Sequence, residues 1–209
     1  MEPSKLTNMH IDILREIGNI GAGNAATSMA QLIDQQVHME VPIVNIVNFD
    51  EMMDIVGGPE KLIVGMFFEI CGDLTGSVFF MLSVEEAEKL VHQMTNDPNL
   101  NLQGDTVDPL AFSALKESAN IITGAYLTAL SDFLNLSIRP SIPHLAVDMA
   151  GAILTVGLVE LSRISDYAIV INTEINDQRI NGITGHFFLL PDPDSLEIIF
   201  ASLGINNDA

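Results

Sequence analysis

The segment EIGNIGAGNAAT, residues 16–27, contains three glycines and could be read either as a phosphate-binding loop or as part of a helix. A phosphate loop places its glycines between a strand and a helix, and a P-loop continues with Lys and then Ser or Thr. Here the preceding residues 12–15, DILR, have helical character, and neither Lys-Ser nor Lys-Thr follows. The pattern therefore favours a helix with an unusually small-residue surface.

A second copy of this helix occurs later in the chain. Residues 11–34, IDILREIGNIGAGNAATSMAQLID, match residues 112–135, FSALKESANIITGAYLTALSDFLN, at an offset of 101. Of the three glycines, only Gly23 has a glycine counterpart, Gly124. The shared feature is instead a polar set with constant spacing, in which Asp12, Glu16 and Asn19 correspond to Ser113, Glu117 and Asn120.

The repeat continues beyond the helix. LTGSVFFML, residues 74–82, matches GITGHFFLL, residues 182–190, at an offset of 109, so the second half has gained about eight residues in between. The segment 96–109 is rich in Asn, Asp, Gly and Pro, as linkers are. We therefore expect a single domain over residues 1–209, built from repeats at about 8–95 and 110–204 that are joined by linker 96–109.

Each copy predicts the same order of elements: a long helix, a strand that starts at Pro, a second helix, two strands and a closing helix. Asp50 and Asp148 are the candidate N-caps of the second helices. Two strands of the set, 62–71 and 167–175, are apolar on both faces and require helices above and below the sheet. The fold class is thus α+β (mixed αβ), with two pseudo-symmetric repeats forming one roughly six-stranded mixed sheet. The expected helices are 8–34, 49–57, 83–94, 110–135, 148–161 and 192–204, and the expected strands are 42–48, 62–71, 74–82, 143–147, 167–175 and 182–190.

Composition excludes several classes of function. The chain has 28 Asp and Glu against 8 Lys and Arg, a formal charge of −20, and such a surface repels nucleic acid and anionic membranes. Cys71 has no second cysteine to pair with, which fits a reducing compartment. The first residues resemble no signal peptide, and the apolar run 145–159 is too short to span a bilayer. We expect a cytoplasmic protein without nucleic-acid or membrane partners.

The repeated polar set forms a strip on each long helix. At 100° per residue, Asp12, Glu16, Asn19 and Gly23 fall within roughly 60° of one another, and so do Ser113, Glu117, Asn120 and Gly124. The glycine at the end of each strip leaves room beside the Asn. Apolar residues occupy the arc that should face the core: Ile13, Leu14, Ile17 and Ile20 in the first helix, and Phe112, Leu115, Ile121 and Ile122 in the second.

Glu and Asn on the solvent face of a single helix would be ordinary surface residues. Asn, however, is a mediocre residue for a helix interior because its side chain competes for backbone hydrogen bonds. Its recurrence mid-helix in both copies, at one spacing from Glu, favours a functional site. Catalytic alternatives are weak, because the five histidines are scattered and no HExxH or G-x-S-x-G motif is present, so a metal site is not expected.

The pattern (Asp/Ser)-x3-Glu-x2-Asn-x22-Pro, found twice, resembles that of the CheC family of chemotaxis phosphatases, which is related to CheX and to the flagellar switch protein FliY. The segments EIGNIGAGNAAT (16–27) and LAVDMAGAIL (145–154) are also similar in sequence to that family. The resemblance covers essentially the whole chain. Because CheX-type proteins keep a single active helix and this chain keeps both Glu-Asn pairs, the CheC branch fits best.

The resemblance implies that the chain hydrolyses the aspartyl phosphate of the response regulator CheY. The regulator would supply its own Mg²⁺ and phosphate-binding Lys, so the chain needs no cofactor of its own. The chain would then only have to position the attacking water and hold the two proteins in register. By this reading Asn19 and Asn120 orient the attacking water, and Glu16 and Glu117 form salt bridges with the regulator. The remaining residues have lesser roles: Asp12 and Ser113 at the edge of each strip, and Pro42 and Pro143 as strand starts.

A binding module is the competing interpretation, because this family is associated with the receptor deamidase CheD, which the chain could sequester or regulate. The candidate CheD-binding residue is Asp148, although a simple N-cap is an equally good explanation for it. A flagellar switch component is a third reading. We expect a monomer that binds phosphorylated CheY and CheD, and we expect the second helix to carry the stronger site, because Gly18, Gly21 and Gly23 destabilise the first by roughly 0.5–1 kcal/mol each relative to Ala.

Overall fold

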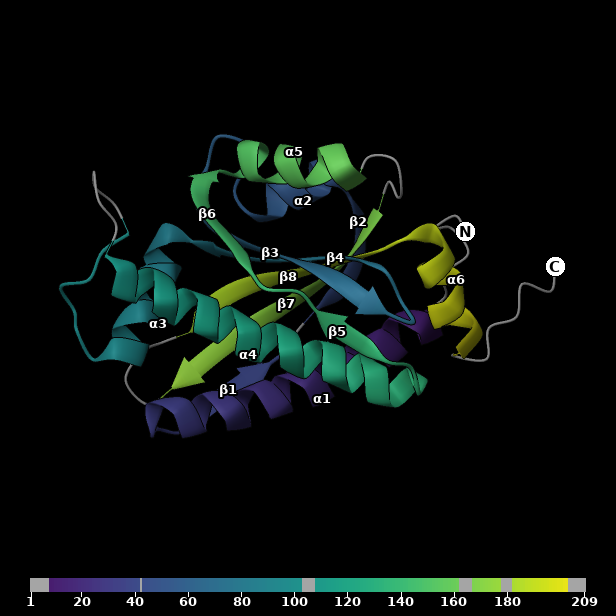
Figure 1. The fold of residues 1–209 in the computed structure, drawn as a ribbon, viewed down its shortest axis with the longest axis horizontal. Coiled ribbons are helices and arrows are strands. Elements are labelled where there is room, and N and C mark those ends of the chain that lie inside the picture. Colours follow the sequence, from purple (N-terminus) through teal and green to yellow (C-terminus); the bar gives the residue numbers. More distant parts are fainter. Residues whose placement is uncertain (1–7, 42, 103–107, 162–166, 178–181, 203–209) are drawn as a thin grey trace.

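The computed structural model describes residues 8–41, 43–102, 108–161, 167–177 and 182–202. Its elements follow one order twice: a long helix, two short strands, a helix, a strand hairpin and a closing helix (Figure 1). The first half contains α1 (Asn8–Ile33), β1 (Val37–Glu40), β2 (Val44–Asn48), α2 (Phe49–Ile55), β3 (Leu62–Gly72), β4 (Gly76–Ser83) and α3 (Val84–Thr95). The second half contains α4 (Pro109–Leu134), β5 (Ile138–Pro140), β6 (His144–Met149), α5 (Ala150–Leu161), β7 (Tyr167–Asp177), β8 (Ile183–Pro191) and α6 (Pro193–Ser202).

One sheet joins the two halves. Its order is β1-β7-β8-β4-β3-β5, with β2 also paired to β7 and β6 also paired to β3, so eight strands occupy six positions. The short strands of each half therefore pair with the hairpin of the other half, and β4 pairs with β8 at the centre. All these pairings are antiparallel, so the prediction of a mixed sheet was wrong. A pseudo-twofold relation between two antiparallel hairpins makes their central strands run in opposite directions.

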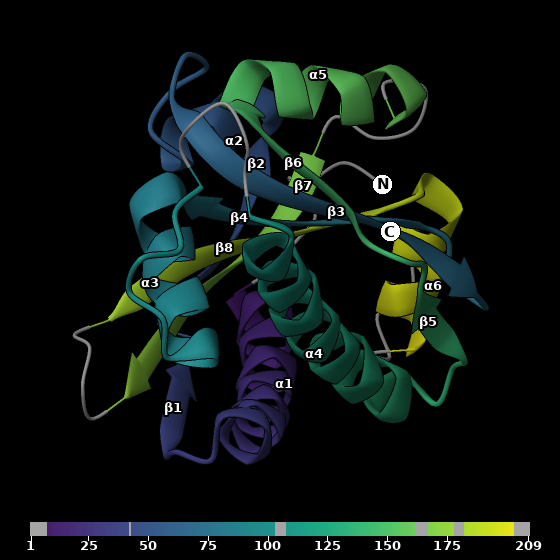
Figure 2. The same cartoon turned by 60° about the vertical axis from the view of Figure 1, so that its left-hand side comes forward.

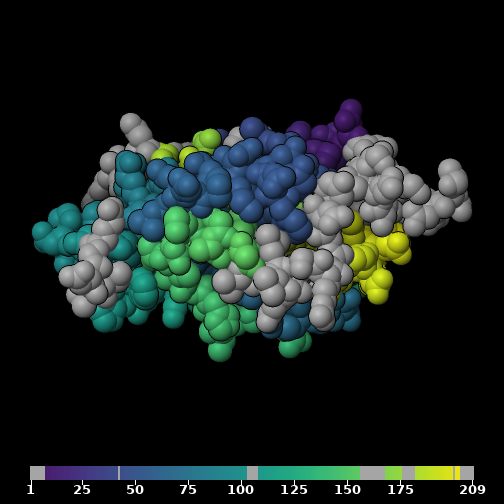
Figure 3. Space-filling view, turned by 90° about the horizontal axis from the view of Figure 1, so that it is seen from above, coloured from purple at the N-terminus to yellow at the C-terminus, as the bar shows by residue number. Residues whose placement is uncertain are grey.

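Helices cover both faces of the sheet, as the doubly apolar strands predict. Along β4, Val78, Phe80 and Leu82 belong to the larger core cluster, under α1, α3 and α4, while the alternate residues Phe79 and Met81 belong to the smaller one. This alternation follows from the two-residue period of a strand. Helices α2 and α5 lie next to each other over the second face (Figures 1 and 3).

The long helices begin and end at recognisable residues. Helix α4 starts at the N-cap Asp108, whose carboxylate accepts from the backbone N–H of Leu110, and Pro109 takes the first helical position. Asp34 and Asn135 follow α1 and α4 in the left-handed region, at φ 52° and 55°. Related residues at an offset of 101 therefore stop the two helices.

Both N-caps predicted for the second helices were wrong. The N-cap of α2 is Asn48, which forms a capping box with Glu51, rather than Asp50. Asp148 lies in β6, where it pairs with Ile63, and α5 begins only at Ala150. Helix α2 starts at Phe49 and β2 ends at Asn48 as predicted, so only the capping residue was wrong there. Helix α5 starts two residues later than predicted because β6 continues to Met149.

The sequence did not predict the short strands β1 and β5. Each has only three or four residues, which is too short for a periodic signal. Pro143 is buried and directly precedes β6, whereas Pro42, linker residues 103–107 and the predicted helical residues 203–204 lie outside the described residues. Within the described ranges, no helix has both the length and the apolar character needed to cross a membrane.

Candidate functional site

Helices α1 and α4 lie side by side and run in opposite directions beneath the sheet (Figures 1 and 2). Gly21 of α1 meets Tyr126 of α4, since a Cβ added at Gly21 would lie 2.9 Å from the Tyr126 Cα and 2.5 Å from its ring Cδ1. The Tyr126 hydroxyl is 2.8 Å from Thr173 Oγ1 in β7. This contact between backbones fixes how the two helices are placed relative to each other and to the sheet.

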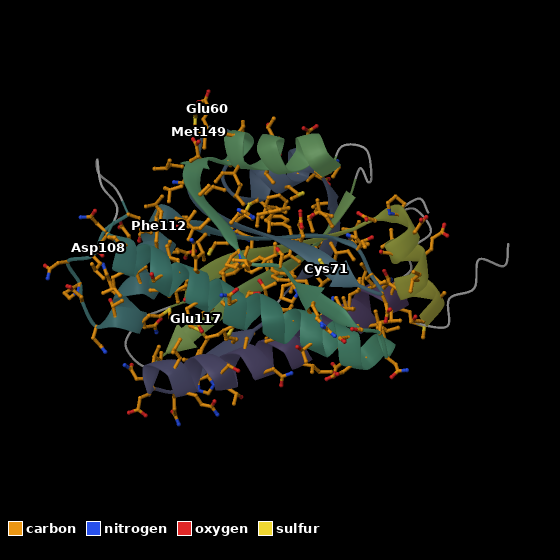
Figure 4. The ribbon with its side chains drawn as sticks, in the orientation of Figure 1. Glu60, Cys71, Asp108, Phe112, Glu117 and Met149 are labelled. Carbon is orange, nitrogen blue, oxygen red and sulfur yellow. The ribbon has the colours of Figure 1, made fainter. Side chains whose placement is uncertain are left out.

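The two polar strips are exposed on these adjacent helices. In α1, Asp12, Glu16, Asn19 and Gly23 are exposed, and in α4, Ser113, Glu117 and Asn120 are exposed while Gly124 is partly exposed. Glu117 is labelled in Figure 4, on the N-terminal half of α4. Leu14 and Ile17 are buried on the opposite side of α1, but Ile20, which the sequence placed in the core, is 43% exposed. Ile20 is excluded from the core because the buried arc of α1 turns through Gly18 and Gly21 instead.

The Glu and Asn side chains of the strips differ from Asp12 and Ser113 in their hydrogen bonding. Within the described residues Glu16, Asn19, Glu117 and Asn120 have no side-chain hydrogen bond or ion pair. By contrast, Asp12 Oδ1 pairs with Arg15 Nη1 at 3.1 Å, and Ser113 Oγ donates to the Pro109 carbonyl oxygen at 2.9 Å. The Glu-Asn pairs therefore keep their full hydrogen-bonding capacity for an incoming partner.

Open space lies beside each Asn. A Cβ added at Gly23 or Gly124 would meet no atom within 4 Å. Beside Asn120 the surface is hollowed into a groove of about 570 Å³ between the two helices. The residues that line it are Asn24, Thr27, Ser28 and Gln31 of α1 and Asn120, Ile121, Gly124, Ala125 and Thr128 of α4.

Asp148 lies apart from the strips, because it lines a surface with residues of α5, on the face of the sheet opposite α1 and α4. Figure 4 labels its neighbour Met149 on the α5 side. Its side chain is exposed, and its Oδ1 accepts from the backbone N–H of Met149 at 2.7 Å. A second groove, of about 510 Å³, is lined by Asp148 and by other residues of β3, β6 and α5. Its walls include Phe67, His144 and Ile153.

The groove beside Asn120 includes α1 residues for which the sequence predicted no role. At 100° per residue, Asn24, Ser28 and Gln31 lie about 100–160° from Asp12, on the arc that was predicted to face the core, so the helix period did not predict their exposure. Their position beside Asn120 could not be predicted either, because it depends on the antiparallel crossing of the helices. Within the described part of the chain, no three His, Cys, Asp or Glu side chains gather as metal ligands would.

The fold is shared with flagellar proteins. Superposition on FliY from Thermotoga maritima gives a TM-score of 0.75 at 19% identity, covering 97% of this chain and all of that one. The middle domain of Helicobacter pylori FliM gives 0.67 at 12% identity, covering 94% of this chain and 99% of that one. At these identities the likeness shows the fold that this chain shares with FliY and FliM.

Sequence comparison identifies the family to which the chain belongs. The model of the CheC-like family matches residues 9–46 and 110–145, the two segments that begin with the Glu-Asn helices. A Bacillus subtilis protein named CheY-P phosphatase CheC is 43% identical over 195 residues, which is 93% of each chain. The present chain belongs to the CheC-like family.

Proposed function

We propose that this chain is a phosphatase that stimulates hydrolysis of the aspartyl phosphate of the chemotaxis response regulator CheY and so terminates its signal. The observation that carries the proposal is the pair of exposed strips in which Glu16 with Asn19, and Glu117 with Asn120, lack partners of their own. The close relative from Bacillus subtilis, named CheY-P phosphatase CheC, supports it. We further propose that the chain acts in the cytoplasm as a monomer.

The chemistry requires little of this chain. Water attacks the phosphorus atom, the bond between phosphorus and the aspartyl oxygen breaks, and inorganic phosphate leaves a free carboxylate on the regulator. The regulator contributes Mg²⁺ and a Lys to this reaction. The Asn19 or Asn120 carboxamide accepts a hydrogen bond from the water and holds it in line, which is catalysis by positioning. No general base is assigned to the chain.

The Glu of each strip has a different task. Glu16 and Glu117 lie one helical turn from their Asn and are exposed, so they can pair with the regulator's Lys across the interface. This contact keeps the two proteins in register. Glu→Gln at either position should therefore raise the KM for phosphorylated CheY at that site, and more so at low salt, where the lost charge pair is least screened.

The decisive test is phosphate release from phosphorylated CheY. Asn19→Ala or Asn120→Ala alone should leave one site working, whereas the double variant should return the rate to that of the regulator by itself. Asn45→Ala, an exposed Asn in β2, is the matched control and should keep full activity. Full activity in the double variant would show that the water is positioned elsewhere.

We also propose that the chain binds the deamidase CheD through the α5 side of the molecule. The supporting observation is the groove of about 510 Å³ whose walls are largely apolar and whose lining includes the exposed Asp148. A largely apolar groove that is lined by two carboxylates, Glu69 and Asp148, suits a protein partner with a basic anchor. Asp148→Asn should weaken CheD binding in a titration, while Asp132→Asn, on α4, should not; equal affinity of both variants would exclude this surface.

A further inference from the structure

The groove beside Asn120 is built by both helices. Because α1 and α4 run in opposite directions and meet at Gly21 and Tyr126, the N-terminal half of α4 lies beside the C-terminal half of α1. Asn120 accordingly shares the groove with Asn24, Ser28 and Gln31 of α1, whereas Glu16 and Asn19 of the α1 strip do not line it. A regulator that reaches Asn120 therefore also meets α1.

The α1 wall of this groove has free hydrogen-bonding groups. Asn24, Ser28 and Gln31 are exposed, and within the described residues their side chains have no hydrogen-bond partner. Thr27 differs, since its Oγ1 donates to the Gly23 carbonyl oxygen at 2.9 Å. Two carboxamides and one hydroxyl are thus available to both donors and acceptors on a docked surface.

The groove is also uncharged. None of its nine lining residues is ionisable, although the chain as a whole has a formal charge of −20. A phosphorylated aspartate is anionic, and carboxylates facing it would oppose its approach. At this site the phosphoryl group can come close to Asn120 without meeting a carboxylate on the α1 wall.

The first site lacks an equivalent wall. At the repeat offset of 101, Asn24, Ser28 and Gln31 correspond to Ala125, Ala129 and Asp132 of α4. The two alanines are buried and cannot donate or accept through their side chains, and Asp132 is an exposed carboxylate. The pseudo-symmetry therefore fails at the positions that would contact a regulator docked at Asn19.

We propose, on the basis of the proposed function, that Gln31 and Ser28 of α1 are docking residues for phosphorylated CheY at the Asn120 site, and that this site binds the regulator more tightly than the Asn19 site does. They contact the protein substrate by hydrogen bonds and take no part in the attack on phosphorus. The two Glu-Asn strips, although alike in sequence, are thus inequivalent in docking.

Single-site backgrounds test the proposal. Asn19→Ala leaves only the Asn120 site, and Asn120→Ala leaves only the Asn19 site. Adding the pair Ser28→Ala and Gln31→Ala should raise the KM for phosphorylated CheY about three- to tenfold in the first background, from the loss of one or two hydrogen bonds, with kcat nearly unchanged. In the second background kcat/KM should stay the same, because docking at the Asn120 strip is then unproductive. Gln31→Glu, which places a carboxylate in the groove, should also raise the KM in the first background only.

Asp132→Ala is the matched control, because Asp132 is the repeat counterpart of Gln31. It should not raise the KM in the Asn19→Ala background. An equal effect of the Ser28 and Gln31 changes in both backgrounds, no effect in either, or an inactive Asn120 site would overturn the proposal. Failure of the unsubstituted protein to accelerate phosphate release would instead refute the proposed function, so the two failures are distinguishable.

Discussion

Tyr126 connects three elements through one side chain. It lies against Gly21 of α1, its ring centroid is 4.8 Å from that of Phe187 in β8, and its hydroxyl is 2.8 Å from Thr173 Oγ1 in β7. Thr173 is fully buried, so Tyr126→Phe leaves its hydroxyl without this partner. We expect the free energy of unfolding in urea to fall by about 1–2 kcal/mol. Adding Thr173→Val should restore part of the loss, because both polar groups are then gone; strictly additive losses would argue against coupling.

The same hydroxyl makes stability depend on alkaline pH. Burial raises the pKa of Tyr126 to about 12, although its hydrogen bond to Thr173 acts in the opposite direction. An unfolded tyrosine has a pKa of about 10, so the folded state holds on to the proton more strongly than the unfolded state does. The stabilisation is therefore complete below pH 10 and is lost as the pH rises toward 12. The stability difference between the native protein and Tyr126→Phe should shrink by about 1 kcal/mol between pH 8 and pH 11. A constant difference would contradict this.

At the scale of elements, the crossing of α1 and α4 depends on one glycine. A Cβ at Gly21 would lie 2.9 Å from the Tyr126 Cα, and a backbone atom cannot move aside as the end of a side chain can. Gly21→Ala should lower the free energy of unfolding by about 1–3 kcal/mol through overpacking. Gly23→Ala is the matched control, because a Cβ there meets nothing within 4 Å and the helix gains about 0.5–1 kcal/mol of propensity. Urea titration of both variants should therefore give shifts of opposite sign.

The glycines of α1 show where prediction from sequence ends. The helical spacing of Glu16 and Asn19 predicted which face of α1 is exposed, since that follows from the period of one helix. Gly21 was predicted only to weaken the helix, because its contact with Tyr126 requires the other helix and its direction. The greater strength of the second site therefore stays a prediction, and the groove beside Asn120 now supports it better than glycine content does.

The other elements also separate into those that the local sequence predicts and those that depend on pairing with the opposite half. The hairpins of β3 with β4 and of β7 with β8 were predicted within a few residues, because long apolar runs end at turn residues. Strands β1 and β5 were missed, since they form only by pairing with the hairpins of the opposite half. The capping box of Asn48 and Glu51 was visible in the sequence NFDE, yet Asp50 was preferred, so that error came from reading local signals and not from missing tertiary information.

At the scale of the whole molecule, the exchange of short strands between halves brings both Glu-Asn helices to one surface. Asn19 is two residues before Gly21, and Asn120 is six residues before Tyr126 on an antiparallel helix. The two Asn residues are thus eight residues apart along the helix axes, or about 12 Å. With the spacing between helices of about 8–10 Å, they are separated by roughly 15 Å.

This separation is smaller than the footprint of a protein. A standard interface covers about 800 Å² per partner, a patch roughly 30 Å across, so two regulators docked at Asn19 and Asn120 would overlap. We expect this chain to bind one phosphorylated CheY at a time, with the two sites competing for it. Sedimentation of the complex at saturating regulator should give a ratio of one to one for the native protein and for Asn120→Ala alike. The Ser28→Ala, Gln31→Ala double variant should bind the regulator more weakly than the native protein, because it loses the hydrogen-bonding groups of the uncharged groove. Two regulators on one chain would mean that the strips face partners independently and that the crossing of the helices does not limit access.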